Sequence, residues 1–330
     1  MPLASARRRP SSARPRLSAP LLVCALAFFG AGAVSAGDAR EALVTNQTGD
    51  SLSFVDLATF KAVAEIKIGG KPAGVALSPD GTRAYVTSPE SKELVIVDAE
   101  TRSIASRLVV GTGPLGIAVA PDGQRVFVAD WYVHKLFAVD PVAVKVVGEV
   151  DVGQSPSGVA VTPDGQLIVT ADRDSNEVSL IDAKTFARVG QIAVGERPFG
   201  VTIDREGKRA YTANVKSDDV SIIDLASRKV VGTVKVEHTP YSVALAGNLA
   251  FVTNQHAGTV SVFDVTTLKI VKTIEVGGYP EGIEADPAGR TVYVACWDAD
   301  TLERIDTTTL EVTGRAAVGS GPRAFGQFLR

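Results

Sequence analysis

The sequence is poor in residues that form covalent cross-links or bind haem and metals. Its 330 residues include two Cys, three His and one Met. Cys24 lies in an N-terminal segment that we expect to be removed, so the remaining Cys296 cannot form an intramolecular disulfide. Stability must therefore come from packing, and we expect Cys296 to pack at a strand end. The sequence has no Cys-x-x-Cys-His motif, which excludes covalent haem attachment.

Long apolar runs are also scarce, and the one at residues 21–34 is too short and wrongly flanked for a membrane span. It follows five arginines and ends in the small residues Val34-Ser35-Ala36. This order is typical of a secretory signal peptide. We therefore predict a signal peptide over residues 1–36, cleavage after Ala36, and a soluble protein in the periplasm or outside the cell.

The predicted cleavage makes the chain more acidic. Residues 1–36 contain five Arg and no acidic residue, so their removal changes the formal net charge from −3 to −8. Nucleic acids and anionic membranes bind to basic surfaces that replace their counterions. The composition therefore disfavours both as partners.

What the sequence does contain is a repeat. Seven prolines recur at intervals of 42, 42, 42, 42, 40 and 42 residues, namely Pro72, Pro114, Pro156, Pro198, Pro240, Pro280 and Pro322. A period of this size is typical of closed or stacked repeat folds. Each unit holds four short runs rich in β-branched residues, separated by turn residues, and no long stretch has a helical period. Each unit therefore predicts a four-stranded antiparallel sheet.

Two turns recur within the units. Pro-Asp-Gly at 79–81, 121–123 and 163–165 fits a tight turn with a glycine at positive φ. A second series lies at the third hairpin, where we expect each aspartate to accept hydrogen bonds from turn amides. This series comprises Asp56, Asp98, Asp140, Asp182, Asp224, Asp264 and Asp306.

The two ends of the repeat complete each other. The chain after residue 40 begins with the last three strands of a unit, and it ends with a lone first strand over Pro322–Leu329. A final strand that completes the first sheet closes a ring and removes its open edges. We therefore predict that residues 37–330 form one all-β domain, a seven-bladed β-propeller of four-stranded antiparallel blades closed in 3+1 fashion.

The segments Leu43-Val44-Thr45-Asn46, Tyr85-Val86-Thr87-Ser88 and Phe251-Val252-Thr253-Asn254 resemble the YVTN repeat of YncE-like propellers. The resemblance covers about residues 41–330 and implies the same architecture. It also allows a role as an accessory or cofactor-binding component of a periplasmic, PQQ-type redox pathway. The fifth unit departs from the pattern, because Leu245-Ala246-Gly247-Asn248 replaces Pro-Asp-Gly and shortens one hairpin.

In such a blade, the loop after the second strand and the connection to the next blade lie on one face of the ring, here called the connection face. The Pro-Asp-Gly and aspartate turns lie on the opposite face, here called the turn face. All three histidines and both tryptophans fall in loops of the connection face. Because loops on a rigid scaffold commonly carry recognition, we expect the binding surface there.

The residue after each repeat proline should line the channel mouth on the connection face. These residues are Ala73, Leu115, Ser157, Phe199, Tyr241, Glu281 and Arg323. A divalent cation needs an oxygen-rich shell, whereas this set has one acid and one base that can pair with each other. A metal-dependent hydrolase or lactonase is therefore a weaker alternative. A three-histidine metal site would require loops to fold across the mouth.

These patterns favour an exported binding or scaffold protein over an enzyme, and they predict neither catalytic residues nor a resident metal or cofactor. We expect a monomer that binds a protein, a peptide or a small molecule. The candidate binding residues are Trp131, Tyr132, His134, Arg197, His238, Tyr241, His256, Tyr279, Glu281, Trp297 and Arg323.

Overall fold

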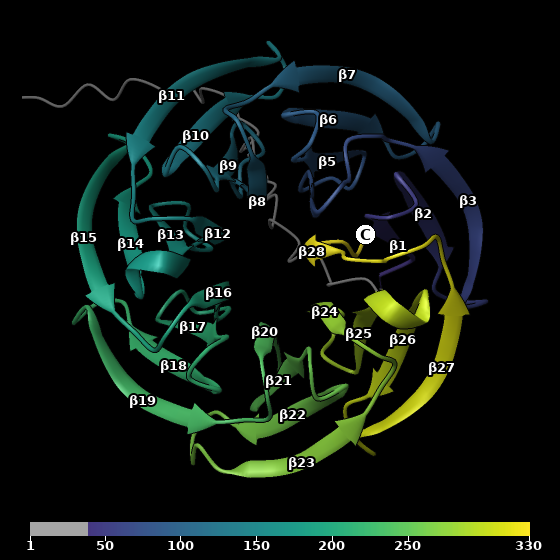
Figure 1. The fold of residues 1–330 in the computed structure, drawn as a ribbon, viewed down its shortest axis with the longest axis vertical. Coiled ribbons are helices and arrows are strands. Elements are labelled where there is room, and N and C mark those ends of the chain that lie inside the picture. Colours follow the sequence, from purple (N-terminus) through teal and green to yellow (C-terminus); the bar gives the residue numbers. More distant parts are fainter. Residues whose placement is uncertain (1–38) are drawn as a thin grey trace, which may run out of the picture. The chain divides into compact units, whose positions relative to one another are not determined.

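Seven β-sheets stand in a ring around a central channel (Figure 1). The computed structural model describes residues 39–330, so the predicted signal peptide and its cleavage site lie outside the described residues. In Figure 1 the strands β3, β7, β11, β15, β19, β23 and β27 form the circumference, whereas β8, β12, β16, β20, β24 and β28 lie near the centre. The predicted seven-bladed propeller is confirmed.

The first four blades follow the chain in order. Blade 1 contains β1 (Glu41–Asn46), β2 (Ser51–Asp56) and β3 (Lys61–Lys67). Blade 2 contains β4 (Gly74–Leu77), β5 (Arg83–Ser88), β6 (Glu93–Asp98) and β7 (Ser103–Val109). Blade 3 contains β8 (Pro114–Val119), β9 (Val126–Asp130), β10 (Lys135–Asp140) and β11 (Lys145–Asp151). Blade 4 contains β12 (Pro156–Val161), β13 (Leu167–Asp172), the 3-10 turn η1 (Arg173–Ser175), β14 (Glu177–Asp182) and β15 (Ala187–Ala193).

The remaining three blades repeat this order. Blade 5 contains β16 (Pro198–Ile203), β17 (Arg209–Asn214), β18 (Asp219–Asp224) and β19 (Lys229–Lys235). Blade 6 contains β20 (Pro240–Ala246), β21 (Leu249–Asn254), β22 (Thr259–Asp264) and β23 (Ile270–Glu275). Blade 7 contains β24 (Pro280–Ala285), β25 (Thr291–Cys296), the 3-10 turn η2 (Trp297–Ala299), β26 (Thr301–Asp306) and β27 (Glu311–Ala317). The short β28 (Phe325–Gly326) ends the chain.

The burial pattern follows the position of each strand in its blade. The second and third strands are buried almost throughout, as in β5 and β6, because neighbouring blades cover both faces. The outer strand β7 alternates between exposed and half-buried residues, because only one of its faces packs inward. Neither 3-10 turn approaches the length of a membrane-crossing helix, and residues 39–330 contain no other helix.

The aspartate turns behave as the sequence predicts. In the third hairpin of blade 4, Asp182 Oδ1 accepts hydrogen bonds from the amides of Lys184 at 3.1 Å and Thr185 at 2.7 Å. All seven aspartates accept such a bond. These bonds hold the pKa of the Asp182 carboxyl below its usual value, because they favour the charged form.

The Thr and Asn of the YVTN pattern have separate structural roles. In blade 6, Thr253 Oγ1 donates a hydrogen bond to the carbonyl oxygen of Glu281 at 2.8 Å and so links two blades. Asn254 Nδ2 donates to Ser261 Oγ at 2.9 Å and ties the strand end to its own blade. The glycine of Pro-x-Gly is required by close packing, because a Cβ on Gly200 would lie 2.6 Å from Tyr241 O.

The C-terminal segment closes the ring along blade 1. Leu43 N donates to Phe328 O at 2.8 Å, and Arg323 N donates to Thr45 O at 2.7 Å, so the segment runs antiparallel to β1. Between these contacts, β28 pairs in parallel with β4 of blade 2. The predicted 3+1 closure is confirmed, and it also reaches the neighbouring blade.

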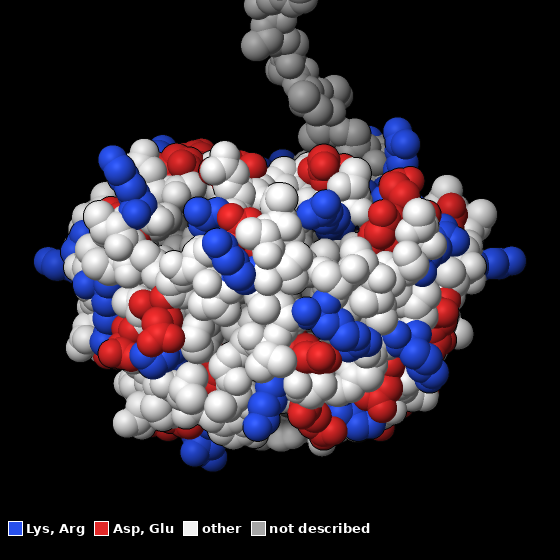
Figure 2. Space-filling model, turned by 90° about the horizontal axis from the view of Figure 1, so that it is seen from above, with Lys and Arg blue, Asp and Glu red and all other residues white. Residues whose placement is uncertain are grey.

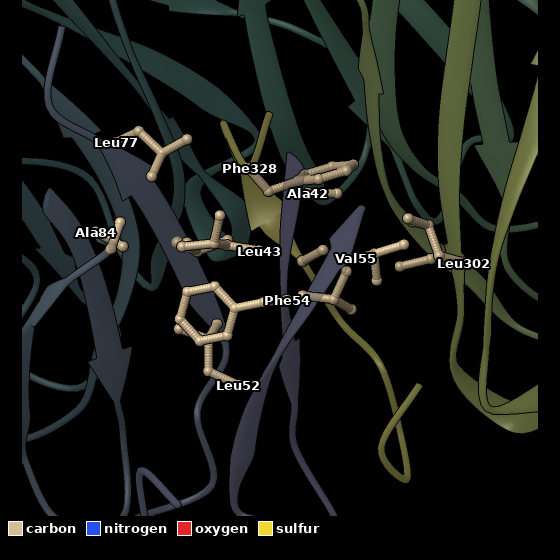
Figure 3. Close-up of a cluster of buried hydrophobic side chains, with 14 of the residues drawn as sticks. Ala42, Leu43, Leu52, Phe54, Val55, Leu77, Ala84, Leu302 and Phe328 are labelled. Atoms are coloured by element: carbon tan, nitrogen blue, oxygen red, sulfur yellow. The ribbon is translucent and has the colours of Figure 1, made fainter. Parts of the chain in front are cut away.

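Blade 1 is held on both sides by buried side chains (Figure 3). Phe54 and Leu43 are fully buried, and their cluster includes Ala84 of blade 2 and Leu302 of blade 7. Phe328 from the C-terminal segment lies in the same cluster, with none of its surface exposed. Burial of one such side chain contributes roughly 1.5–3 kcal/mol, so the closing segment is held by packing as well as by backbone hydrogen bonds.

Candidate functional site

Every residue predicted to form the binding surface lies in a loop or strand end of the connection face. Trp131, Tyr132 and His134 lie between β9 and β10. Tyr241 and Glu281 are the second residues of their inner strands. The structure places nine of the eleven predicted residues in a pocket, a plug in the channel mouth or a row of rings over blades 6 and 7, and it leaves His134 and Arg197 outside these groups.

The pocket encloses about 450 Å³ beside the channel mouth. Trp131 and Tyr132 form one wall, and Tyr132 is 67% exposed. Arg323 reaches the pocket from the C-terminal segment. Leu115 and Phe199, which the sequence predicts at the channel mouth, also line the pocket. The other lining residues were not predicted from the sequence; they are Gln47, Thr48, Lys71, Pro89, Glu90 and Gly113. An aromatic wall therefore faces charged groups of both signs.

Asp130 holds the aromatic wall in place. Its Oδ2 accepts hydrogen bonds from the amides of Thr112 and Gly113, at 2.5 and 2.8 Å. Its Oδ1 accepts from the amides of Tyr132 and Val133, at 2.9 and 3.0 Å. The buried carboxylate thus ties the loop after β9 to the connection before β8. Its place at the Asn position of the YVTN pattern is the signal that could have revealed it.

Trp131 is also held by its neighbours. The guanidinium of Arg173 lies 5.3 Å from the centre of the Trp131 ring, within the range of a cation–π contact. Phe199 packs on the indole with ring centres 6.1 Å apart. Arg197, which was predicted as a binding residue, lies near this group, with its Nε 3.9 Å from Asp174 Oδ1. It is not part of the pocket lining.

An aromatic plug closes the channel mouth below the pocket. The rings of Phe199 and Tyr241 have centres 4.2 Å apart, and Phe325 lies 5.1 Å from Phe199 and 5.7 Å from Tyr241. All three rings are buried. Ala73 and Leu115 belong to the same cluster, as their place in the repeat predicts, whereas Phe325 was not predicted to lie there.

A buried ion pair completes the plug. Arg323 Nε lies 2.7 Å from Glu281 Oε2, so the pairing of these two residues that the sequence allowed is present. Arg323 also donates to the Tyr241 hydroxyl, and Gln255 Nε2 donates to Glu281 Oε1 at 2.7 Å. Burial raises the pKa of Tyr241, so its hydroxyl remains protonated and neutral. The charges of the mouth are therefore already matched within the protein.

Four predicted residues form a row of rings over blades 6 and 7. His238 and His256 have ring centres 5.5 Å apart, Tyr279 follows His256 at 5.3 Å, and Trp297 follows Tyr279 at 6.4 Å. His256 Nδ1 is 2.8 Å from Thr239 Oγ1. The row is a second aromatic surface on the same face.

The three histidines do not converge. His134 accepts a hydrogen bond at Nδ1 from Ser155 N, at 3.0 Å between blades 3 and 4, away from the other two. Within residues 39–330, no group of three or more His, Cys, Asp or Glu side chains has an arrangement that could hold a metal ion. Cys296 is fully buried at the end of β25, and burial raises the pKa of its thiol.

One side of the ring carries charged side chains of both signs. Figure 2 shows Lys and Arg intermixed with Asp and Glu on that side, with neither sign gathered into a continuous area. A surface of this kind does not present the basic stripe by which proteins hold nucleic-acid backbones.

Comparison with known proteins supports the architecture. A sequence model of the family described as YNCE-like beta-propeller matches residues 23–119. No curated protein matches the sequence.

Solved structures resemble the fold over most of the chain. A functionally unknown protein from Desulfotomaculum acetoxidans is 17% identical, with a TM-score of 0.76 over 86% of this chain and 98% of that chain. Kuenenia stuttgartiensis hydrazine synthase is 22% identical, with a TM-score of 0.71 over 77% of this chain and 89% of that chain. The dihydro-heme d1 dehydrogenase NirN, in complex with DHE, is 20% identical, with a TM-score of 0.65 over 84% of this chain and 63% of that chain.

At these identities the structural likeness concerns the fold alone. The family match over residues 23–119 and the ring of seven blades together confirm the resemblance that the YVTN segments predicted: this chain is similar to the YncE-like β-propellers and has their seven-bladed fold.

Proposed function

We propose that this protein is an exported, non-enzymatic binding protein that holds a protein, a peptide or a small molecule on its connection face. The observation that carries the proposal is the 450 Å³ pocket walled by Trp131 and Tyr132. Its size lies within the range of ligand sites, and its combination of rings with a few polar groups is typical of them. Aromatic side chains held in place by neighbours lose little conformational entropy when a ligand binds.

The chemistry of the mouth favours binding over metal-dependent hydrolysis. Such a reaction would need several oxygen ligands converging on one cation. The mouth offers one carboxylate, Glu281, which is already paired with Arg323 and hydrogen-bonded to Gln255. The rings of Phe199, Tyr241 and Phe325 pack together at the same mouth.

The experiment is affinity capture from periplasmic extract with three forms of the mature protein. The wild type is compared with Trp131→Ala/Tyr132→Ala and with Gln124→Ala/Gln166→Ala, a control on the exposed turns of the opposite face. The proposal predicts at least one molecule that the wild type and the control retain and the pocket variant loses. Equal retention by the pocket variant would contradict it.

A ligand obtained in this way can be placed by fluorescence. The chain has two tryptophans, and both belong to the connection face. Trp297→Phe leaves Trp131 as the sole indole, so saturable quenching or a spectral shift in this variant would locate binding at the pocket. If the emission of Trp131 does not respond and that of Trp297 does, the row of rings is the site instead.

A further inference from the structure

The central channel contains a second cavity on the far side of the plug. It encloses about 540 Å³ and is lined by the inner strands from blade 2 to blade 7 and by the C-terminal segment. Phe325 belongs to both the plug and this cavity, so the plug forms its floor. We call this space the turn-face chamber, because it lies beside Pro79, Pro121 and Pro163 of the turns.

The lining of the chamber is mainly apolar. It includes Val119, Val161, Ile203, Leu245 and Ala285 from five different blades. A cavity of this volume with a mostly apolar wall and few polar groups matches the sites that bind small organic molecules. None of its lining residues belongs to the candidate pocket of the connection face.

The rim of the chamber is altered at blade 6. The turn between β20 and β21 has only Gly247 and Asn248, as the shortened fifth unit of the sequence predicts. Arg205 of blade 5 crosses this short turn and donates from Nη2 to the carbonyl oxygen of Pro287 in blade 7, at 2.6 Å. Arg205 is therefore engaged at the rim, and its side chain joins two blades that are not neighbours.

One carboxyl group in the chamber has a free oxygen. Glu284 Oε2 accepts hydrogen bonds from the amides of Phe328 and Leu329, at 2.5 and 2.9 Å. Its other oxygen, Oε1, makes no hydrogen bond to residues 39–330, although Glu284 is partly buried and lines the chamber. Burial raises the pKa of this carboxyl to about 8, because the loss of water outweighs the two hydrogen bonds from the backbone amides.

The other charged residues of the lining, Asp204 and Arg205, already have partners. Asp204 Oδ1 accepts from Lys208 N at 2.7 Å, and Arg205 donates to the carbonyl oxygen of Pro287. Glu284 is thus the lining carboxyl with one oxygen that has no hydrogen-bond partner among residues 39–330. A desolvated carboxylate is stabilised most by a positively charged hydrogen-bond donor.

We propose that the turn-face chamber is a second binding site, and that it takes a small organic amine. The carboxyl of Glu284 gives up its proton to solvent as the amine binds, the ammonium group donates to Glu284 Oε1, and the apolar body of the amine lies against the branched side chains of the inner strands. Two backbone amides already hold the carboxyl in one orientation, so a ligand does not have to order it. The site is independent of the pocket on the connection face, since the plug separates the two.

The test uses two probes of matched shape, 1-naphthylmethylamine and 1-naphthylmethanol, titrated by calorimetry into the mature protein at neutral pH. The amine is expected to bind one to one, and at least about tenfold more tightly than the alcohol. Glu284→Gln should weaken the amine by about tenfold or more and change the alcohol by less than about twofold. Glutamine can still accept from the amides of Phe328 and Leu329, so the fold should be retained.

Two further variants locate the site. Val161→Phe places an aromatic ring on the blade 4 wall of the chamber, leaves Glu284 of blade 7 unchanged, and should weaken the binding of both probes. Trp131→Ala alters the connection face and should leave both affinities unchanged. Equal affinity for the two probes, no effect of Glu284→Gln, or loss of amine binding in Trp131→Ala would each overturn the proposal. A failure of the capture experiment would not affect the proposal of amine binding in the turn-face chamber, because the capture experiment tests the pocket on the connection face.

Discussion

Replacing Asp172 with asparagine should stabilise the protein at neutral pH. Asp172 ends β13 with none of its surface exposed, and it accepts hydrogen bonds from Gly153 N at 3.0 Å, Thr170 Oγ1 at 2.8 Å and Ser179 Oγ. Burial nevertheless raises the pKa of this carboxyl to about 6, because the loss of water outweighs the three hydrogen bonds. Ionisation of Asp172 therefore opposes folding.

The same position in blade 5 shows that asparagine fits. Asn214 Nδ2 donates to Ser221 Oγ at 2.9 Å, and Ser221 Oγ accepts from Gly195 N at 3.3 Å. Ser179 occupies the place of Ser221 in blade 4, so it can accept from the Gly153 amide once Asp172 has become an amide. The substitution therefore removes a charge without leaving a buried donor unsatisfied.

The magnitude follows from the shift in pKa. An acid whose pKa is higher in the folded state does not lower the free energy of unfolding below its unfolded pKa of 3.8. As the pH rises from there through about 6, its ionisation lowers the free energy of unfolding, and above that pH the loss is complete. The loss is about 3 kcal/mol at pH 7, since one pKa unit corresponds to about 1.4 kcal/mol. We expect Asp172→Asn to recover about 1–3 kcal/mol at pH 7 and almost nothing at pH 4.

Urea unfolding of both proteins from pH 4 to pH 8 measures this difference. Asp130→Asn is the matched control, because each carboxyl oxygen of Asp130 accepts from two backbone amides. Asparagine has only one accepting oxygen, and its NH2 group would leave two of these amides without an acceptor. It should lower the free energy of unfolding by about 2 kcal/mol or more. A difference between Asp172→Asn and the wild type that stays constant with pH would refute the reasoning, as would stabilisation by Asp130→Asn.

Three further changes test the plug, the links between blades and the closure. Glu281→Gln leaves Arg323 buried without its counter-charge and should cost about 3 kcal/mol in urea unfolding, whereas the double variant with Arg323→Met should cost less than the two single changes together. Thr253→Val removes the hydrogen bond to the next blade and should cost about 1 kcal/mol, and a loss below the error of the measurement would argue against a stabilising link. Deletion of residues 322–330 uncovers β1 and should lower the melting temperature measured by circular dichroism by more than about 10 °C; an unchanged melting temperature would show that closure adds little.

The fold could be predicted in detail because its information is local and repeated. Each Pro-Asp-Gly turn and each aspartate turn specifies a hairpin from neighbouring residues, and seven copies reinforce one another. The phase of the chain ends then specified the closure. Even the short hairpin at Gly247 was evident from the sequence, since it changed the interval between two prolines.

The candidate site was predictable only in part. The alternation of strand direction assigned Trp131, His256 and Trp297 to one face correctly. Which of these side chains contact one another depends on the conformations of loops that belong to different blades. His238 and His256 lie together and His134 does not, although the sequence places all three in loops of the connection face. Phe325 entered the plug because the closing segment bends toward β4.

By itself, the sequence determined the number of blades, the order of their strands and the face that carries the unusual side chains, because these depend on residues close together in the repeat. Only the tertiary structure decided which side chains from distant units share a space. The pocket, the plug and the chamber each join residues from several blades, and their volumes and unpartnered groups arise from packing around the channel. Glu284 illustrates the difference: in the sequence it is one acid in a strand, and in the ring its free oxygen belongs to a chamber.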